Sequence, residues 1–191
     1  MAYITNMQIN GVEYKSGNSG IDSSTETLQL IDCAHHEIHS GNHYYMEGFV
    51  ELDNTDAFYI KLVTPNNTKW SHFMWEITST GVLETFLDED TAGGMTGGTS
   101  IMPINNNRNS ANISEMIITG NVVACTGYTV RISSQKFGVA SVPSKATGGN
   151  SSRDNELILK QNIAYCRGFI SGSNGNIVNF RASWYEHANK N

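Results

Sequence analysis

The sequence has few cysteines, and their positions fit neither a disulfide framework nor a zinc cluster. Cys33, Cys125 and Cys166 are the three cysteines in 191 residues. An odd number of widely spaced cysteines without a CxxC pair is not the pattern of a disulfide-stabilised secreted domain or of a structural zinc site. We therefore predict three reduced thiols in the core of a protein made in the cytosol.

Long apolar runs and basic clusters are also missing. No segment reaches the ~18 consecutive apolar residues that a transmembrane helix needs, and the first residues, MAYITNMQIN, lack the basic and apolar regions of a signal peptide. The formal net charge is -6, and Lys and Arg are scattered singly. Because nucleic-acid binding relies on clustered basic side chains, the sequence predicts neither a nucleic-acid nor a membrane partner.

Proline is scarce, at three residues, and no stretch repeats apolar residues at the spacing of an amphipathic helix. Alternation with a period of two is abundant instead. It is clearest near the end of the chain, where four apolar residues share one face: Val178, Phe180, Ala182 and Trp184. The loop Ser171–Asn176 contains only Gly, Ser and Asn, so residues 155–187 are predicted to form a hairpin.

Further strand patterns run through the middle of the chain. We expect a buried strand at 28–34, strands at 46–52 and 58–62, and a hairpin of 70–78 with 82–87 through Ser79–Gly81, in which Phe73, Trp75 and Ile77 point inward. Residues 88–98 read as a solvated acidic and glycine-rich loop. Many short strands joined by polar turns predict an all-β fold, an antiparallel β-sandwich of the jelly-roll kind.

The N-terminal region is predicted to be separate from the sandwich. Residues 3–14 have the pattern of a small hairpin around Asn10-Gly11, and a polar connector follows to residue 26. We divide the chain into residues 1–26, a short hairpin arm that could anchor the protein, and residues 27–191, the sandwich. The role of the polar segment 133–150 is left open.

Three side chains are low-ranking candidates for a metal site: His35, Glu37 and His39. On a strand, alternate residues share a face, and nitrogen and oxygen donors so placed suit zinc or manganese. The zincin motif places two residues between its glutamate and second histidine, whereas only Ile38 separates Glu37 from His39. The cupin order is not reproduced either. With no nucleophile elbow or phosphate loop in the sequence, we predict no enzyme and no cofactor.

Exposed aromatic side chains are the better candidates for binding. Trp75 and Trp184 fall on core-facing positions, whereas Trp70 and Tyr185 fall on the opposite face. The candidate contacts for a ligand or partner are Trp70, Tyr185, Tyr44 and Arg108. Flat rings of this kind stack on sugars, and they also form protein interfaces.

Five strings together resemble a family of small virion proteins of tailed bacteriophages, in crAss-like and related gut phages: HEIHSGNHY, VTPNNTKWSH, NNNRNS, NELILKQN and SWYEH. The likeness spans roughly residues 28–187. The family members are regarded as head decoration, auxiliary capsid or head-fibre proteins. The resemblance implies a virion location on the capsid surface, the major capsid protein and other virion proteins as partners, and no active site.

The sequence therefore supports one leading hypothesis and two alternatives. The leading one is a non-enzymatic auxiliary capsid protein on the outside of the head, a homo-oligomer for which the three-fold positions of a capsid favour a trimer. The second is a glycan-binding module or head fibre for attachment to host or mucus. The third is a metal-dependent cupin-like enzyme at His35, Glu37 and His39.

Overall fold

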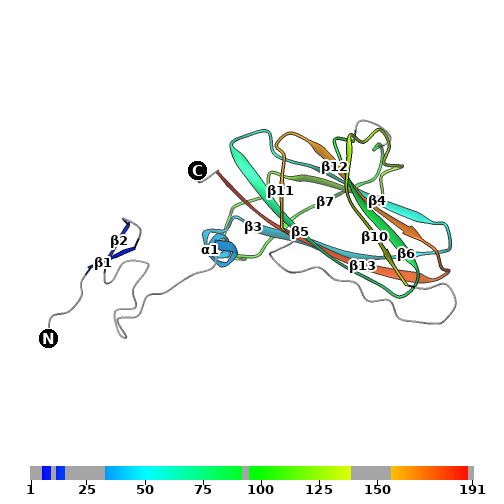
Figure 1. The fold of residues 1–191 in the computed structure, drawn as a ribbon, viewed down its shortest axis with the longest axis horizontal. Coiled ribbons are helices and arrows are strands. Elements are labelled where there is room, and N and C mark those ends of the chain that lie inside the picture. The colour runs from blue at the N-terminus through cyan, green and yellow to red at the C-terminus, as the bar shows by residue number, and fades with distance from the viewer. Residues whose placement is uncertain (1–5, 10–11, 16–32, 92–94, 139–155, 189–191) are drawn as a thin grey trace. The chain divides into compact units, whose positions relative to one another are not determined.

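The computed structural model describes residues 6–9, 12–15, 33–91, 95–138 and 156–188 (Figure 1). The chain divides into two compact units, Met1–His36 and Glu37–Asn191. In the first unit, strands β1 (Asn6–Ile9) and β2 (Val12–Lys15) pair antiparallel, with Ile9 opposite Val12. This pairing confirms the predicted N-terminal hairpin. The connector through residue 26 and the predicted boundary at 26–27 lie outside the described residues.

Two antiparallel sheets form the second unit (Figure 1). Their strands are β3 (His43–Leu52), β4 (Ala57–Val63), β5 (Lys69–Ser79), β6 (Leu83–Glu89), β7 (Thr99–Ile101), β8 (Ile104–Asn105), β9 (Ile117–Gly120), β10 (Val130–Phe137), β11 (Leu157–Leu159), β12 (Ala164–Ser171) and β13 (Asn176–Ala188). The six-stranded sheet has the order β10-β6-β12-β4-β9-β7, and the five-stranded sheet has the order β11-β5-β13-β3-β8.

The pairing is that of an antiparallel ribbon folded back on itself. β3 pairs with β13, β4 with β12, β5 with β11 and β6 with β10, so that the outermost strands in sequence pair first and the innermost last. β13 also pairs with β5, and β12 with β6, which joins the ribbon into two sheets. This order is a jelly roll, and it confirms the predicted fold class. β7, β8 and β9 are inserted between β6 and β10 and extend both sheets on one side.

Both predicted hairpins in the sandwich are wrong, because β5 and β6 lie in different sheets, as do β12 and β13. A loop rich in Gly, Ser and Asn permits the positive φ that Gly175 adopts, at 60°, but it does not decide whether the chain returns within a sheet or crosses to the other one. The buried Asn176 side chain links the two crossings. It accepts hydrogen bonds from Ser79 Oγ and Gly81 N, both at 2.8 Å, and donates to Val82 O at 3.0 Å.

The core lies between the sheets, as the alternation predicts. Phe73, Trp75 and Ile77 of β5 are buried, and so are the four alternating apolar residues of β13. The rings pack in edge and stacked contacts: Phe73 and Trp75 have centroids 5.4 Å apart, and Phe169 and Phe180 have centroids 5.6 Å apart. Trp75 and Trp184 therefore serve as core residues, which confirms their sequence assignment.

A helix begins at the last two residues of the predicted strand 28–34 and covers the histidine-rich segment that follows. α1 spans Cys33–Ser40, whereas residues 28–32 of the predicted strand lie outside the described residues. The helix ends in a Schellman motif: Gly41 N donates to Ile38 O at 3.0 Å, Asn42 N donates to Glu37 O at 2.9 Å, and Gly41 has a φ of 74°. Gly41 and Asn42 thus form the C-terminal cap of the helix.

Two acidic residues assigned to a solvated loop are buried in β6. Asp88 is fully buried and accepts a two-point contact from Arg131, at 2.8 and 3.0 Å. Glu89 accepts hydrogen bonds from Tyr165 Oη at 3.0 Å and from Lys160 Nζ at 2.6 Å. Arg131 on β10, Lys160 just after β11 and the Tyr165 hydroxyl on β12 permit this burial, and a local sequence pattern cannot show such partners.

The prediction of three reduced thiols is wrong for two of them. Cys125 and Cys166 form a disulfide, with their Cα atoms 6.0 Å apart. Cys166 is fully buried on β12, and Cys125 precedes β10 in a segment that the fold brings next to β12. The two cysteines are 41 residues apart in the sequence, and no sequence pattern marks them as partners.

Candidate partner-binding surfaces

The helix removes the geometric basis of the predicted metal site. His35, Glu37 and His39 were placed on one face only because a strand was assumed, and in α1 alternate residues lie about 200° apart around the axis. Glu37 is 2% exposed and accepts a hydrogen bond from Asn42 Nδ2 at 3.2 Å, whereas His35 and His39 are exposed. Within the described ranges, no group of three His, Cys, Asp or Glu side chains could hold a metal ion.

The four predicted contact residues have very different environments. Tyr44 and Tyr185 are each 2% exposed, so neither offers a surface to a ligand, and the prediction is wrong for both. Burial raises the pKa of Tyr44 to about 12. Trp70, at 37% exposure, and Arg108 lie on the surface, on β5 and in the turn after β8.

Tyr185 is buried because other side chains cover it at one end of the outer face of the five-stranded sheet. Its ring stacks with His72 at 4.5 Å and with His187 at 5.5 Å, and its hydroxyl donates to Glu156 Oε1 at 2.8 Å. His43 stacks on the same ring at 6.2 Å. Tyr185 faces outward on its strand and is nevertheless buried, because the neighbouring rings cover it.

His43 lies at the same end of the sheet and is buried. Asn106 Nδ2 lies 2.9 Å from His43 Nδ1. Burial and the nearby Arg181 lower the pKa of His43, while Glu156 and Glu37 act in the opposite direction.

The segment of residues 99–123, which contains β7, β8 and β9, forms one side of the sandwich and presents large apolar side chains to solvent. We call five of them the apolar edge: Met102 (85% exposed), Ile113 (82%), Val123 (72%), Ile117 (62%) and Ile104 (37%). Scattered single apolar residues are normal on a surface, but five within one short segment indicate an interaction surface.

Polar contacts hold this segment in place. The Asn105 side chain donates to Gly41 O at 2.8 Å and to Asn112 O at 3.0 Å. Further along, the buried Glu186 carboxylate accepts hydrogen bonds from Ser114 Oγ at 2.5 Å and from Glu115 N at 3.1 Å. The apolar edge is thus fixed by hydrogen bonds to the core, and its side chains are presented without the need to order a loop on binding.

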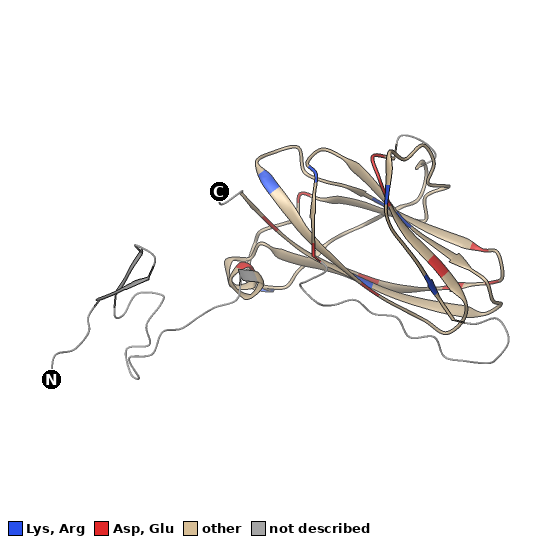
Figure 2. Cartoon of the chain, viewed as in Figure 1, with Lys and Arg blue, Asp and Glu red and all other residues tan. Residues whose placement is uncertain are grey.

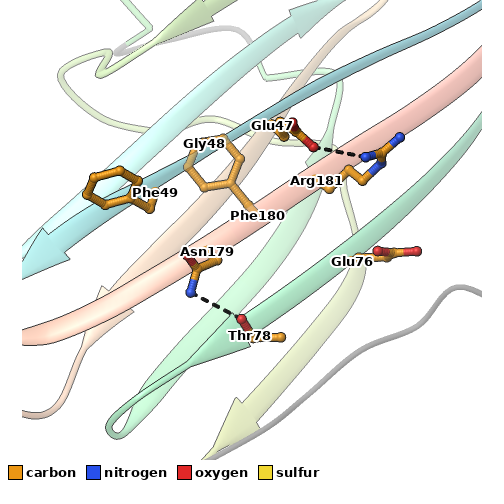
Figure 3. A pocket seen from close by; sticks show the side chains of 8 residues that line it. All are labelled: Glu47, Gly48, Phe49, Glu76, Thr78, Asn179, Phe180 and Arg181. Atoms are coloured by element: carbon orange, nitrogen blue, oxygen red, sulfur yellow. Dashed lines mark hydrogen bonds and ion pairs between the residues drawn. The ribbon is translucent and has the colours of Figure 1, made fainter. Parts of the chain in front are cut away.

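A second surface is an open depression of about 390 Å³ in the outer face of the five-stranded sheet (Figure 3). Its floor includes Gly48, where an added Cβ would lie 3.1 Å from the Phe180 ring. Phe49, 74% exposed, stands at one side, and Glu76 lines the rim.

Two polar pairs complete the lining of this depression. Arg181 Nη1 donates to Glu47 Oε2 at 2.9 Å, and its guanidinium lies 4.5 Å from the centroid of the Tyr45 ring. Asn179 Nδ2 donates to Thr78 Oγ1 at 3.3 Å. The sequence analysis did not single out Phe49. Phe49 has an odd number in a strand whose even-numbered residues face the core, and this alternation would have predicted that its ring is exposed.

Charged side chains show no concentration of one sign on the described elements (Figure 2). Lys, Arg, Asp and Glu are spread over both sheets, in agreement with the scattered charges of the sequence. Among the described residues, no helix has the length and apolar character to cross a membrane.

Comparison with known proteins identifies no relative. No family model, no curated protein and no solved structure matches the chain. The resemblance to phage head proteins therefore stays a prediction that rests on the five sequence strings.

Proposed function

We propose that this chain is a non-enzymatic virion structural protein, an auxiliary capsid protein that binds the outer surface of a bacteriophage head as a homo-oligomer. The observation that carries the proposal is the apolar edge: five large side chains exposed to solvent in one segment that hydrogen bonds tie to the rest of the jelly roll. The resemblance of the five strings to head proteins supports the same conclusion. The jelly roll is used by viral capsid proteins, and this fold-level analogy adds weight without deciding function.

Burial of the apolar edge supplies the association energy in this proposal. Fully burying one Ile, Met or Val side chain contributes about 1.5–3 kcal/mol, so a few such residues stabilise a contact of modest area. On a capsid, many identical copies present the same surface, and neighbouring contacts raise the occupancy further. A trimer at three-fold positions is the form that this lattice favours.

The test introduces one charge into the apolar edge and measures binding to heads. Ile113→Asp is expected to reduce the fraction of protein that co-sediments with purified heads at least ten-fold, because an exposed carboxylate becomes buried in the contact. The matched control is Ile158→Asp on β11, since Ile158 is 54% exposed and lies outside the edge segment. Equal binding of Ile113→Asp and wild type would refute the assignment of this surface, and cryo-EM of the parent particle without density for the protein would refute the function.

A second candidate function is glycan binding, which the depression around Phe49 favours. An exposed ring beside amide, hydroxyl, guanidinium and carboxylate groups suits a sugar, because one face of a sugar is apolar and its hydroxyls both donate and accept. Phe49→Ala would abolish a glycan-array signal that Ile113→Asp leaves intact. Absence of any signal for wild type would remove this candidate, and it would leave the capsid proposal unaffected.

A further inference from the structure

An arginine lies inside the sandwich. Arg167 is on β12, between the core residues Tyr165 and Phe169 in the inward-facing alternation, and it is 4% exposed. Its guanidinium is 5.4 Å from the Trp75 ring of the opposite sheet and 5.9 Å from the Phe169 ring. Its one side-chain hydrogen bond in the described part of the chain runs from Nη1 to Ser133 Oγ on β10, at 3.2 Å.

The carboxylate partners of two other arginines, one pair with a buried carboxylate and one exposed, show what Arg167 lacks. Arg131 makes a two-point contact with the buried Asp88, and Arg181 pairs with Glu47. Across the described ranges, no carboxylate lies within ion-pair distance of Arg167. A buried cation without a counter-charge is unfavourable. Burial lowers the pKa of Arg167 to about 10, so the group is still charged at neutral pH.

Two buried N–H groups at this position have no acceptor. Arg167 Nε and Trp75 Nε1 are each inaccessible to solvent and lack a hydrogen-bond partner within the described residues. Both atoms can only donate. Native proteins rarely leave such groups unsatisfied, and each exception calls for an explanation. Here the two donors and the uncompensated positive charge occur together.

We propose that Arg167 and Trp75 bind a small monovalent anion, of the size of chloride or formate, between the two sheets. A bound anion accepts from Arg167 Nε and Trp75 Nε1 and neutralises the guanidinium. A water molecule would satisfy the donors and leave the charge uncompensated. Both donors belong to side chains buried in the core, so the proposal is limited to a small ion, and the Arg167 contact with Ser133 connects it to β10, an end strand of its sheet.

The test measures thermal stability of the full chain as sodium chloride replaces sodium gluconate at constant ionic strength. Wild type is expected to gain about 5 °C or more in Tm when chloride is saturating, because an ion that binds only the folded state stabilises it. Arg167→Met, which removes the charge and keeps the apolar stem, is expected to show no chloride dependence. The control Arg181→Met alters an exposed arginine and is expected to keep the wild-type dependence.

A second measurement does not depend on the variants folding. Crystals of wild type grown with bromide are expected to show an anomalous peak within hydrogen-bond distance of Arg167 Nε and Trp75 Nε1. The proposal is overturned if wild type shows the same Tm in chloride and gluconate, if Arg167→Met retains the chloride dependence, or if bromide is found elsewhere and not between the sheets.

Discussion

Replacing the buried carboxylate of Glu186 by an amide tests how the apolar edge is attached to the core. Glu186 is 1% exposed and occupies the next inward position after Trp184 on β13. It accepts hydrogen bonds from Trp184 Nε1 at 3.0 Å and from Met116 N at 3.4 Å, besides those from Ser114 and Glu115. Glu186→Gln keeps the shape and removes the charge, and it turns an NH₂ group toward some of these donors.

The magnitude follows from the number of donors that lose their acceptor. A buried group without a partner costs about 1–3 kcal/mol, and an amide oxygen still satisfies part of the set. We expect Glu186→Gln to lower the free energy of unfolding by about 3 kcal/mol. For a chain of this size this corresponds to a fall in Tm of about 6–12 °C.

Urea denaturation followed by far-UV circular dichroism measures the change, and amide hydrogen exchange locates it. Exchange at Glu115 and Met116 is expected to accelerate more than exchange in β12, since their N–H groups bond to the carboxylate directly. The control is Glu47→Gln, which alters an exposed ion pair worth less than about 1 kcal/mol. A loss below about 1 kcal/mol for Glu186→Gln, or unchanged exchange at Met116, would refute the reasoning.

Three further predictions concern the disulfide, the pH response and the close packing of two neighbouring strands. Reduction of the Cys125–Cys166 disulfide is expected to lower the free energy of unfolding by roughly 4 kcal/mol, because the disulfide closes a loop that restricts the unfolded chain. Thiol titration of the unfolded, unreduced chain is expected to find one free thiol, and three free thiols would contradict the pairing. Because the pKa of His43 is lowered in the folded state, the unfolded chain binds the proton more readily. The contribution of His43 to stability is therefore full above about pH 6.5 and falls as the pH drops below that value. Urea unfolding midpoints between pH 7.5 and 5.5 measure this dependence, and His43→Gln is expected to flatten it. Gly168→Ala is expected to cost about 1–3 kcal/mol by thermal unfolding, because the added Cβ would lie 2.3 Å from the Phe86 ring; a neutral effect would show that this ring moves freely.

Strand positions were predictable from the sequence, whereas their partners were not. Alternation placed Phe73 and Ile77 of β5 in the core correctly, because the pattern reports only which face is buried. Alternation does not show whether the next strand pairs in the same sheet or crosses to the other sheet. Both predicted sandwich hairpins failed for this reason, although the jelly-roll class was correct.

The sites were harder to predict because their charges depend on distant partners. Glu186 and Arg167 each occupy a strand position that faces the core, in alternation with apolar residues. Once the strands are known, this position indicates that the charged side chain is buried. Their consequences differ, since Glu186 meets donors from residues 114–116 and Arg167 meets no carboxylate within the described ranges. For α1, the period-two assumption itself was wrong, and the cap at Gly41 was the overlooked signal.

The pairing of β3 with β13 has a consequence for biosynthesis. The earliest strand of the sandwich hydrogen-bonds to the latest one along ten residue pairs, from Asn176 with Leu52 to Tyr185 with His43. A ribosome must therefore release residues 176–188 before the central strand of the five-stranded sheet exists. Until then the nascent chain keeps its apolar faces uncovered, and such late, long-range closure makes folding slow and leaves time for aggregation or chaperone capture.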